Sequence, residues 1–169
     1  MTTTFVTPTS VAPAAFLQEA IDLAVANISE GGRPFGAVVV KYGRVISRGV
    51  NETHLSNDPT AHAEMLAVRA ASQVLQSPLL ESCTLYASGH PCPMCLAAMR
   101  MAGVTDVFYA FTNPEAEPYG LSTTCLYEEL GLPTSLRHLR LVHFPTELTG
   151  HHPYEAWATA RGIQITTSP

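Results

Sequence analysis

The first part of the chain has apolar residues at steps of three and four positions. They begin after residue 13 and stop at Gly31 and Gly32, which are typical of the end of a helix. The apolar positions are Phe16, Leu17, Ala20, Ile21, Ala24, Val25 and Ile28. The pattern predicts an amphipathic helix from residue 13 to the two glycines. Residues 1–12, rich in Thr, Ser and Pro, are expected to form a flexible N-terminal segment.

The middle of the chain alternates between strand-like and helix-like patterns. Two β-branched runs joined by "KYGR" predict a hairpin over "PFGAVVVKYGRVISRGVN". Turn-forming residues followed by helical ones predict a helix that ends near position 76 in "NDPTAHAEMLAVRAASQVL". A short strand is predicted over "CTLYAS", a helix with proline at its start over "PCPMCLAAMRMAG", and another strand over "VTDVFYAF".

The pattern is less regular after Asn113. We expect a loop over "PEAEPYG", a short helix over "TTCLYEEL", a strand over "LRHLRLVHF" and a last helix over "HPYEAWATARG". In that helix, Tyr154 and Trp157 are expected to be packing anchors. A hairpin followed by strands and helices in alternation indicates the α/β class, with helices on both faces of one sheet. At 169 residues, the chain is expected to form a single domain over residues 13–169.

The composition limits the kinds of partner that the chain is expected to bind. Hydrophobic residues make up 46% of the chain and charged residues only 14%, which leaves apolar surface that a homo-oligomer would cover. The formal net charge is −5 and the arginines are scattered, so no basic stripe is expected to bind nucleic acid. The start of the chain has no signal-peptide pattern, and no run approaches about 20 apolar residues. We therefore expect a cytoplasmic protein without a membrane partner.

The stretch "HPCPMC" places Cys92 and Cys95 three positions apart at the start of a predicted helix. There they share one helix face, and the helix dipole favours the thiolate form. Taken alone, the pair could be a redox pair, part of a metal site, or two buried thiols without chemistry. The other two cysteines, Cys83 and Cys125, have no ligand spacing and are assigned to the interior.

A second helix start carries "HAE" at residues 62–64. His62 together with Cys92 and Cys95 supplies three protein ligands and leaves a fourth tetrahedral position for water, which is the composition of a catalytic zinc site. Glu64 would stand beside that water without binding the metal. A lone histidine is more often structural, but the three ligand residues in this order favour one Zn²⁺ per chain.

The order His-x-Glu followed by Pro-Cys-x-x-Cys is the signature of zinc-dependent nucleobase deaminases. From about residue 13 to 161 the chain resembles the cytidine-deaminase-like superfamily, and within it the bacterial guanine deaminases. The matching strings are "RPFGAVVV", "GVNETHLSNDPTAHAE", "PCPMCLAAM", "VFYA" and "YEAWA". The resemblance implies a three-layer α/β/α sandwich around a mixed sheet of about five strands.

The resemblance also implies a zinc-dependent aminohydrolase that converts guanine to xanthine and ammonia. Zinc lowers the pKa of a bound water from near 16 to about 7. Glu64 would take the released proton, deliver it to a ring nitrogen and then help the amine to depart. Zinc and N–H groups at the helix start, including that of Ala63, would hold the tetrahedral intermediate.

Further roles are implied by the resemblance. Asn51 would hydrogen-bond the base edge, Phe35 would lie against the ring together with His62, and Glu115 would be a second proton carrier near the leaving amine. The segment from about residue 112 would be exchanged across a homodimer, so Glu115 could act in trans. From the residues alone, Asn51 could equally be a turn residue, Phe35 a core aromatic and Glu115 a solvated loop charge.

The chain departs from guanine deaminases at three places. It has His90 where they generally have Glu, Met101 where they have an aromatic residue, and a tail "GIQITTSP" without a terminal aromatic. We expect His90 and Met101 to contact the substrate and to change its hydrogen bonds and stacking wall. The substrate therefore stays open among guanine, other aminopurines, aminotriazines, cytosine and nucleosides.

Two other functions remain as alternatives. A tRNA adenosine deaminase would share the zinc strings, but it needs a cationic face that this acidic chain does not provide. A zinc site without catalysis would have no use for the uncoordinated carboxylate of Glu64.

Overall fold

A computed structural model describes residues 11–133 and 138–165; most of the predicted flexible segment lies outside these ranges. The elements in chain order are α1 (Val11–Ser29), β1 (Gly36–Lys41), β2 (Arg44–Val50), α2 (Thr53–Ser56), α3 (Ala63–Leu75), β3 (Cys83–Gly89), α4 (Pro93–Met101), β4 (Asp106–Phe111), α5 (Asn113–Ala116), the 3₁₀ helix η1 (Glu117–Tyr119), α6 (Thr124–Glu129), β5 (Arg140–His143) and α7 (Pro153–Arg161). None of the described helices has the length and apolar character needed to cross a membrane.

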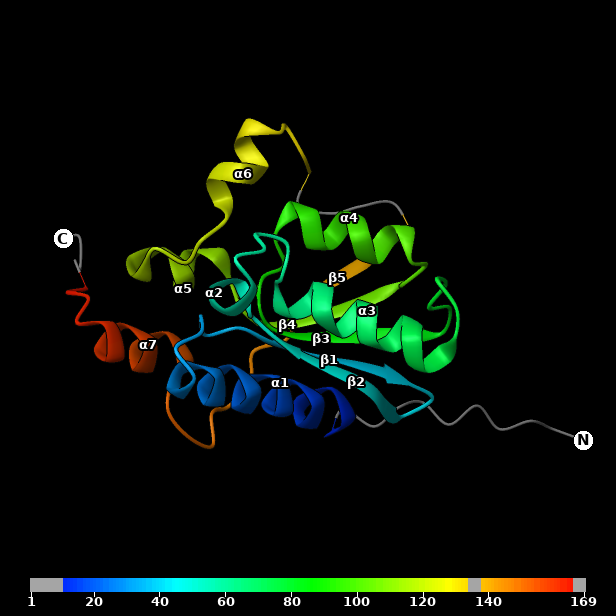
Figure 1. Ribbon diagram of the computed structural model, residues 1–169, viewed down its shortest axis with the longest axis horizontal. Helices are drawn as coiled ribbons and strands as arrows, with labels where there is room; N and C mark the ends of the chain where they lie inside the picture. Colours follow the sequence, from blue (N-terminus) through cyan, green and yellow to red (C-terminus); the bar gives the residue numbers. More distant parts are fainter. Residues whose placement is uncertain (1–10, 134–137, 166–169) are drawn as a thin grey trace, which may run out of the picture.

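The sheet has five strands in the order β2-β1-β3-β4-β5 (Figure 1). β1 runs antiparallel to both of its neighbours, β2 and β3, whereas β4 runs parallel to β3 and β5. The hairpin turn consists of Tyr42 and Gly43, which both have positive φ (51° and 75°), as a type I′ turn requires. The predicted mixed sheet of about five strands is confirmed.

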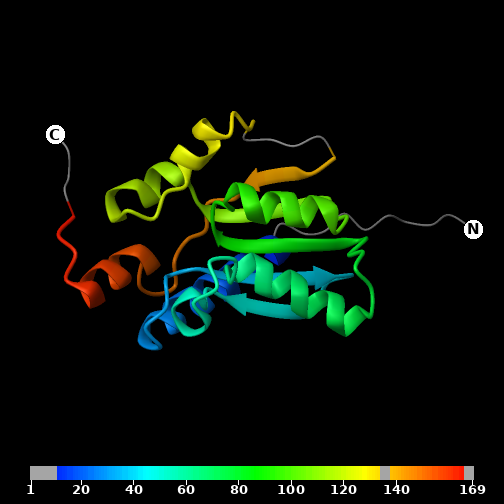
Figure 2. The same cartoon turned by 45° about the horizontal axis from the view of Figure 1, so that its top comes forward.

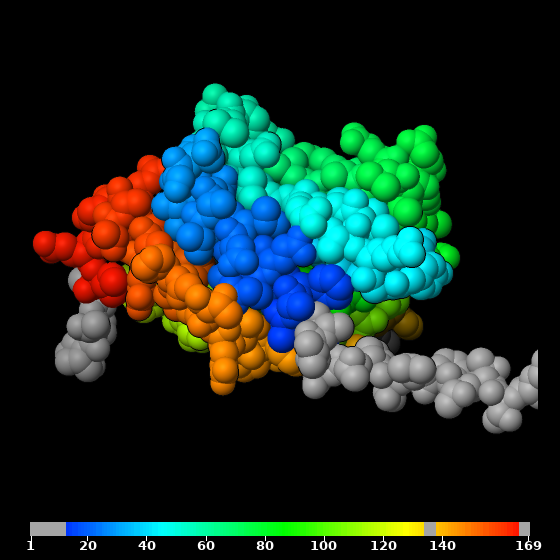
Figure 3. Space-filling view, turned by 90° about the horizontal axis from the view of Figure 1, so that it is seen from below, coloured from blue at the N-terminus to red at the C-terminus, as the bar shows by residue number. Residues whose placement is uncertain are grey.

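Helices cover both faces of the sheet. α3 and α4 lie on one face, and α1 lies on the other with α7 at its end (Figures 1 and 2). Figure 3 shows α1 on its own face, between the β1–β2 hairpin and the segment that leads into α7. The residues of α1 that face the sheet are fully or almost fully buried, as their helical spacing predicts: Leu17, Ala20, Ile21 and Ala24. The three-layer α/β/α sandwich is therefore confirmed.

The segment "PEAEPYG", expected to be a loop, is helical. It forms the end of α5 and the whole of η1. The reason is a capping box: the Thr112 hydroxyl accepts from the Glu115 N–H, and the Glu115 carboxylate accepts from the Thr112 N–H. The proline at the start of α5 needs no N–H acceptor there, which further favours the helix.

The prediction that Cys83 and Cys125 both lie in the interior is confirmed for the first and wrong for the second. Cys83 is buried, but Cys125 is exposed on α6. The short helix α6 buries only Tyr127 against the rest of the molecule, so its other positions, including 125, face solvent.

The strand directions bring three sequence-distant segments to one edge of the sheet. Because β1 is antiparallel to β2 and β3, it begins where they end. Phe35 precedes β1, Asn51 follows β2 and His90 follows β3. The Asn51 N–H donates to the Phe35 carbonyl oxygen at 3.2 Å, which ties two of these segments together. Helices α3 and α4 also start at this edge (Figure 1).

Candidate active site

His62 stands directly before α3, as the N-cap residue with extended backbone. The turn that delivers it is held by Asp58, whose carboxylate accepts from the Thr60 N–H at 2.8 Å and the Thr60 hydroxyl at 2.7 Å. The His62 side chain does not cap the helix. Its ring is therefore free to face the start of α4.

Gly49 in β2 sets how closely α3 approaches the sheet. A Cβ atom at this position would lie 2.2 Å from the carbonyl oxygen of Ala63 and 2.6 Å from the nitrogen of Ala67. Both are backbone atoms, so they could move away only if the helix moved. The glycine thus allows the first turn of α3, with His62 and Glu64, to pack directly against the strand.

Cys92 holds the corresponding place before α4, where Pro93 occupies the first helical turn. The loop before it is anchored from α6, because the Tyr127 hydroxyl donates to the Pro91 carbonyl oxygen at 2.6 Å. Cys95 is three positions further along and fully buried. The two thiols therefore point to the same side, toward His62.

The three side chains converge as a metal site requires. Cys92 Sγ lies 3.6 Å and Cys95 Sγ 3.7 Å from His62 Nδ1, and the two sulfur atoms are 3.5 Å apart. Tetrahedral zinc with typical Zn–S and Zn–N bonds would place its ligand atoms roughly 3.5–3.8 Å from one another. The three ligand atoms are thus positioned to bind a metal ion, and the Cys₂His donor set suits zinc with one position left open.

The pKa values of the two thiols are shifted in opposite directions. The hydrogen bond from the Cys95 thiol is the main cause that lowers the pKa of Cys92 to about 4, and the hydrogen bond with His62 lowers it further. The same thiolate raises the pKa of Cys95. The Cys92 hydrogen bond also raises the pKa of His62. Before a cation binds, the pair therefore holds one thiolate and one thiol, and a divalent metal would displace the second proton.

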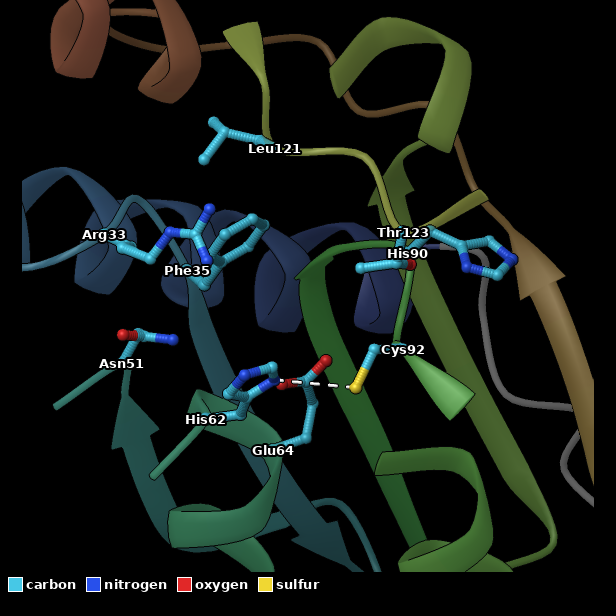
Figure 4. Close-up of a pocket in the computed structure, with 9 residues that line it drawn as sticks. All are labelled: Arg33, Phe35, Asn51, His62, Glu64, His90, Cys92, Leu121 and Thr123. Carbon is cyan, nitrogen blue, oxygen red and sulfur yellow. Dashed lines mark hydrogen bonds between the residues drawn. The ribbon is translucent and has the colours of Figure 1, made fainter. Parts of the chain in front are cut away.

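Glu64 lies beside the ligands in the first turn of α3 and is 8% exposed. Burial, followed by the negative charge of Cys92, raises the pKa of Glu64 to about 7. In Figure 4 its carboxylate lies at the base of the pocket, between His62 and Cys92. A carboxyl group with a pKa near neutrality can both accept and donate a proton under ordinary conditions.

A cavity opens above this cluster. Its lining consists of Arg33, Phe35, Asn51, His62, Glu64, His90, Cys92, Leu121 and Thr123 (Figure 4). The structure therefore brings Phe35, Asn51 and His90 together with the metal-binding cluster, as expected. Ala63 is fully buried at the start of α3 and does not line the cavity.

Asn51 is both a turn residue and a pocket residue. It is 1% exposed, and its carbonyl oxygen accepts from the Thr53 N–H at 3.4 Å and the Thr53 hydroxyl at 2.8 Å. Its amide nitrogen faces the cavity in Figure 4. Phe35 likewise has two roles. It lines the cavity, and its ring packs edge-on against Tyr154 with ring centroids 5.9 Å apart.

His90 reaches the cavity, but its ring is turned away from the base of the pocket (Figure 4). The ring packs edge-on against Tyr109 and Tyr127, with centroids 4.8 Å and 5.4 Å away. Its Nδ1 atom lies 3.0 Å from the Pro91 carbonyl oxygen, and burial lowers its pKa. In this arrangement His90 positions the loop before Cys92 and does not aim a polar atom at Glu64.

Met101, which was expected to contact the substrate, does not line the cavity of its own chain. Met101 is the last residue of α4 and is 82% exposed. Nine residues of helix at about 1.5 Å each place it roughly 13 Å from Cys92 at the other end. Met101 lies instead over a shallow apolar hollow between α3 and α4.

Glu115 is not in the pocket of its own chain either. It is exposed, and its carboxylate accepts from the Thr112 hydroxyl at 2.5 Å and the Thr112 N–H at 2.7 Å. Partial burial acts to raise the pKa of Glu115, but these hydrogen bonds together with the nearby His143 and His152 lower it overall. Within this chain the side chain stabilises α5.

Three lining residues were not expected from the sequence: Arg33, Leu121 and Thr123. Arg33 directly precedes the "PFG" string, so its place next to Phe35 could have been inferred. Leu121 and Thr123 have no local signal, since they reach the pocket only because the segment between η1 and α6 folds back over it.

Comparisons with known proteins agree with this geometry. Residues 12–111 match the family described as the cytidine and deoxycytidylate deaminase zinc-binding region. The guanine deaminase of Bacillus subtilis (strain 168) is 42% identical over 144 residues, which cover 84% of this chain and 91% of that protein. An X-ray structure of guanine deaminase from Bacillus subtilis covers 91% of this chain and 96% of its own, with 39% identity and a TM-score of 0.67. A tRNA-specific adenosine deaminase of Aquifex aeolicus is 33% identical over 132 residues, covering 78% of this chain and 85% of that protein.

Proposed function

Because the chain belongs to the cytidine and deoxycytidylate deaminase zinc-binding family, we propose that it is a zinc-dependent hydrolytic deaminase that converts guanine to xanthine and ammonia. One observation carries the chemistry: His62, Cys92 and Cys95 converge on one point, and the buried carboxylate of Glu64 stands beside them. The likeness to guanine deaminase over most of both chains supports guanine as the substrate.

His62, Cys92 and Cys95 would hold the zinc ion, one per chain. When bound, zinc supplies a Lewis acid that lowers the pKa of a water molecule to about 7. The thiolate character of Cys92 is the protonation state that metal ligation needs, and the metal would displace the proton that the raised pKa of His62 favours on its ring.

Glu64 moves the protons of the reaction. Its carboxylate takes a proton from the attacking water and delivers it to the ring nitrogen beside the amino-bearing carbon. It then takes the second proton, from the hydroxyl now attached to the carbon, and gives it to the departing amine, which leaves as ammonia while the carbonyl forms. The N–H group of Ala63 lies at the positive end of α3, and although its side chain does not line the cavity, this N–H would stabilise negative charge on the oxygen that adds to the carbon.

Phe35 and Asn51 would hold the base. The Phe35 ring offers a flat apolar face, and the Asn51 amide nitrogen offers a hydrogen-bond donor from the wall of the cavity. The Asn51 carbonyl oxygen is already engaged with Thr53, which fixes the amide orientation. A donor held in this way favours a ring with an acceptor on its edge.

We also propose that residues 13–169 act as one domain in a cytoplasmic homodimer. The segment from about residue 112 would exchange between protomers, so that Leu121 and Thr123 would cover the partner's cavity as they cover their own here. Glu115 would then be a second proton carrier only in trans, since within one chain it lies outside the pocket.

The direct test is the turnover of the zinc-loaded protein on a panel of substrates. Guanine, adenine, cytosine, their nucleosides, an aminotriazine and a tRNA would each be assayed for ammonia release. We expect guanine to react with the highest kcat/KM. Turnover of tRNA alone would instead assign the chain to the tRNA adenosine deaminases, and turnover of another ring alone would move the substrate within the same chemistry.

A further inference from the structure

Arg33 brings a positive charge into the cavity without a partner of its own. Among the residues that the structure describes, its guanidinium makes no hydrogen bond or ion pair. It is half-buried, and burial lowers its pKa. Removing such a group from water is unfavourable unless another group satisfies its N–H donors. An unpaired guanidinium that lines a ligand cavity therefore indicates that a ligand supplies the acceptors.

The backbone under Arg33 is fixed by Asn27 of α1. The Asn27 amide donates to the Arg33 carbonyl oxygen at 2.8 Å and to the Asn51 carbonyl oxygen at 2.9 Å. Gly32 makes room for this contact, because a Cβ there would lie 2.2 Å from the Asn27 amide nitrogen. Asn27 is 5% exposed, so these two hydrogen bonds are shielded from water. Arg33 is thus held in a set position relative to Asn51 and the neighbouring Phe35.

The hydrogen-bond acceptors and donors of the cavity lie on opposite sides. Glu64, the acceptor and proton carrier, lies at the base with the metal ligands, whereas Arg33 lies on the other side of the cavity, nearer Leu121 (Figure 4). Arg33 has five N–H donors and no acceptor, and the free amide nitrogen of Asn51 is also a donor. A ring that places its amino-bearing carbon at Glu64 must therefore present acceptors to the opposite side.

Guanine has this arrangement. Its reacting carbon, C2, lies across the purine from O6 and N7, which are both acceptors, and arginine commonly binds this pair of atoms with two hydrogen bonds. Adenine carries an amino donor in place of O6, which would face the donors of Arg33. We propose that Arg33 determines specificity by donating hydrogen bonds to the O6 and N7 edge of a 6-oxopurine. This inference rests on the proposed guanine deaminase function.

The test compares Arg33→Met and Arg33→Lys with the wild type and with Arg44→Met. Arg44 serves as the control because it is an exposed arginine at the start of β2, directly after the hairpin turn. Each zinc-loaded protein is assayed for kcat/KM on guanine. Calorimetry measures the Kd of hypoxanthine, which has O6 and N7 but no amine, and of unsubstituted purine, which has N7 but lacks O6. We expect Arg33→Met to weaken hypoxanthine binding and to lower guanine kcat/KM by roughly 10- to 100-fold, with less than about a threefold change for purine.

Arg33→Lys should recover part of the loss, because one ammonium can donate to O6 but cannot bind both acceptors at once. Arg44→Met should match the wild type on every ligand. An equal loss for hypoxanthine and purine would indicate a structural role and overturn the proposal. The Kd values of inorganic phosphate and deoxycytidylate are measured in the same way. A loss in Arg33→Met confined to these two ligands would also overturn the proposal, because Arg33 would then be a phosphate ligand. Failure of the wild type on guanine would instead overturn the proposed function.

Discussion

At the residue scale, the site occupies positions where other residue types would stabilise the helices better. His62 and Cys92 are both N-cap residues, and neither side chain accepts a hydrogen bond from its helix. A serine, threonine, aspartate or asparagine at such a position typically contributes about 1 kcal/mol. The two helix starts therefore give up capping so that the side chains can converge on a metal.

Two buried tyrosines give a prediction about polar satisfaction. The Tyr127 hydroxyl donates to the Pro91 carbonyl oxygen at 2.6 Å, whereas the hydroxyl of Tyr154, which is 0% exposed, has no partner among the described residues. Tyr154→Phe should raise the free energy of unfolding by about 1 kcal/mol because it removes an unsatisfied buried group. Tyr127→Phe should lower it by a similar amount.

Urea denaturation of the two variants measures both changes against the wild type. The pair controls for the shared loss of a hydroxyl from an aromatic ring. A marked loss of stability in Tyr154→Phe would mean that its hydroxyl is satisfied, for example by water, and would contradict the account of this core.

At the scale of elements, α7 depends on a titratable cap. The Nδ1 atom of His152 accepts from the Tyr154 N–H at 3.2 Å, and the ring packs against Phe111 with centroids 4.6 Å apart. Burial lowers the pKa of His152 below its ordinary value, while the nearby charges of Glu155 and Glu115 oppose this. The neutral ring is therefore the form that stabilises the helix start.

This predicts that the hydrogen-exchange protection of α7 depends on pH. A lowered pKa in the folded state gives stability that is complete above the ordinary histidine pKa of about 6.5 and is lost as the pH falls through the folded-state pKa. Protonation removes the acceptor, so protection of the α7 amides should fall as the pH drops below about 6.5, by a free energy of about 1 kcal/mol.

The control is His152→Asn, which keeps an N-cap acceptor that does not titrate. Its α7 protection, corrected for intrinsic exchange, should be the same across this pH range. The neighbouring His151 is exposed, and His151→Asn should behave as the wild type. Protection that fell equally with pH in His152→Asn would assign the effect to another group.

Most elements could be predicted from the sequence because their signals are local. The helical spacing of Leu17 and Ile21 and the β-branched runs of the hairpin depend only on nearby residues. The loop expected at "PEAEPYG" was wrong although Thr112 and Glu115 have the spacing of a capping box. That signal is also local, but it predicts a helix start without showing that so short a helix persists.

The site was predictable where motif spacing fixes geometry. His62, Cys92 and Cys95 converge because each has a set place at a helix start, and the two helices begin at the same edge of the sheet. Met101 lies outside the cavity of its own chain because the rise along α4 separates it from Cys92, which the position of a residue in a motif does not show. Leu121 depends on a fold-back between two short helices, which no local pattern specifies.

At the scale of the whole molecule, the pocket has two sources in the chain. Its base and walls come from the segments before β1, α3 and α4, and its cover comes from Leu121 and Thr123 beyond residue 112. Leu121 is only 4% exposed in this cover. If the proposed homodimer exchanges the C-terminal segment, each active site contains the base of one protomer and the cover of the other.

Complementation between two inactive variants tests this exchange. Glu64→Gln disables the base, and Leu121→Arg should disable the cover by placing a charge in a buried position. In an exchanged heterodimer, one of the two sites combines an intact base with an intact cover. Co-expression should then restore about a quarter of the wild-type activity, because half of randomly paired dimers are heterodimers with one working site.

Each variant expressed alone, and the two variants mixed without exchange of subunits, should stay inactive. If co-expressed protein is dimeric by light scattering and still inactive, the cover belongs to its own chain, and the proposal that Glu115 acts in trans is contradicted with it.

The most direct test of the central claim is one preparation of Glu64→Gln, measured both for zinc content and for ammonia release from guanine. The account predicts about one zinc per chain, as in the wild type, because Glu64 is not among the converging ligands. It predicts that kcat falls by at least about a thousandfold, because Glu64 is the one carboxylate among the described residues that line the cavity, and a Glu115 supplied in trans would serve only the leaving amine. Turnover close to that of the wild type with zinc in place would contradict the account.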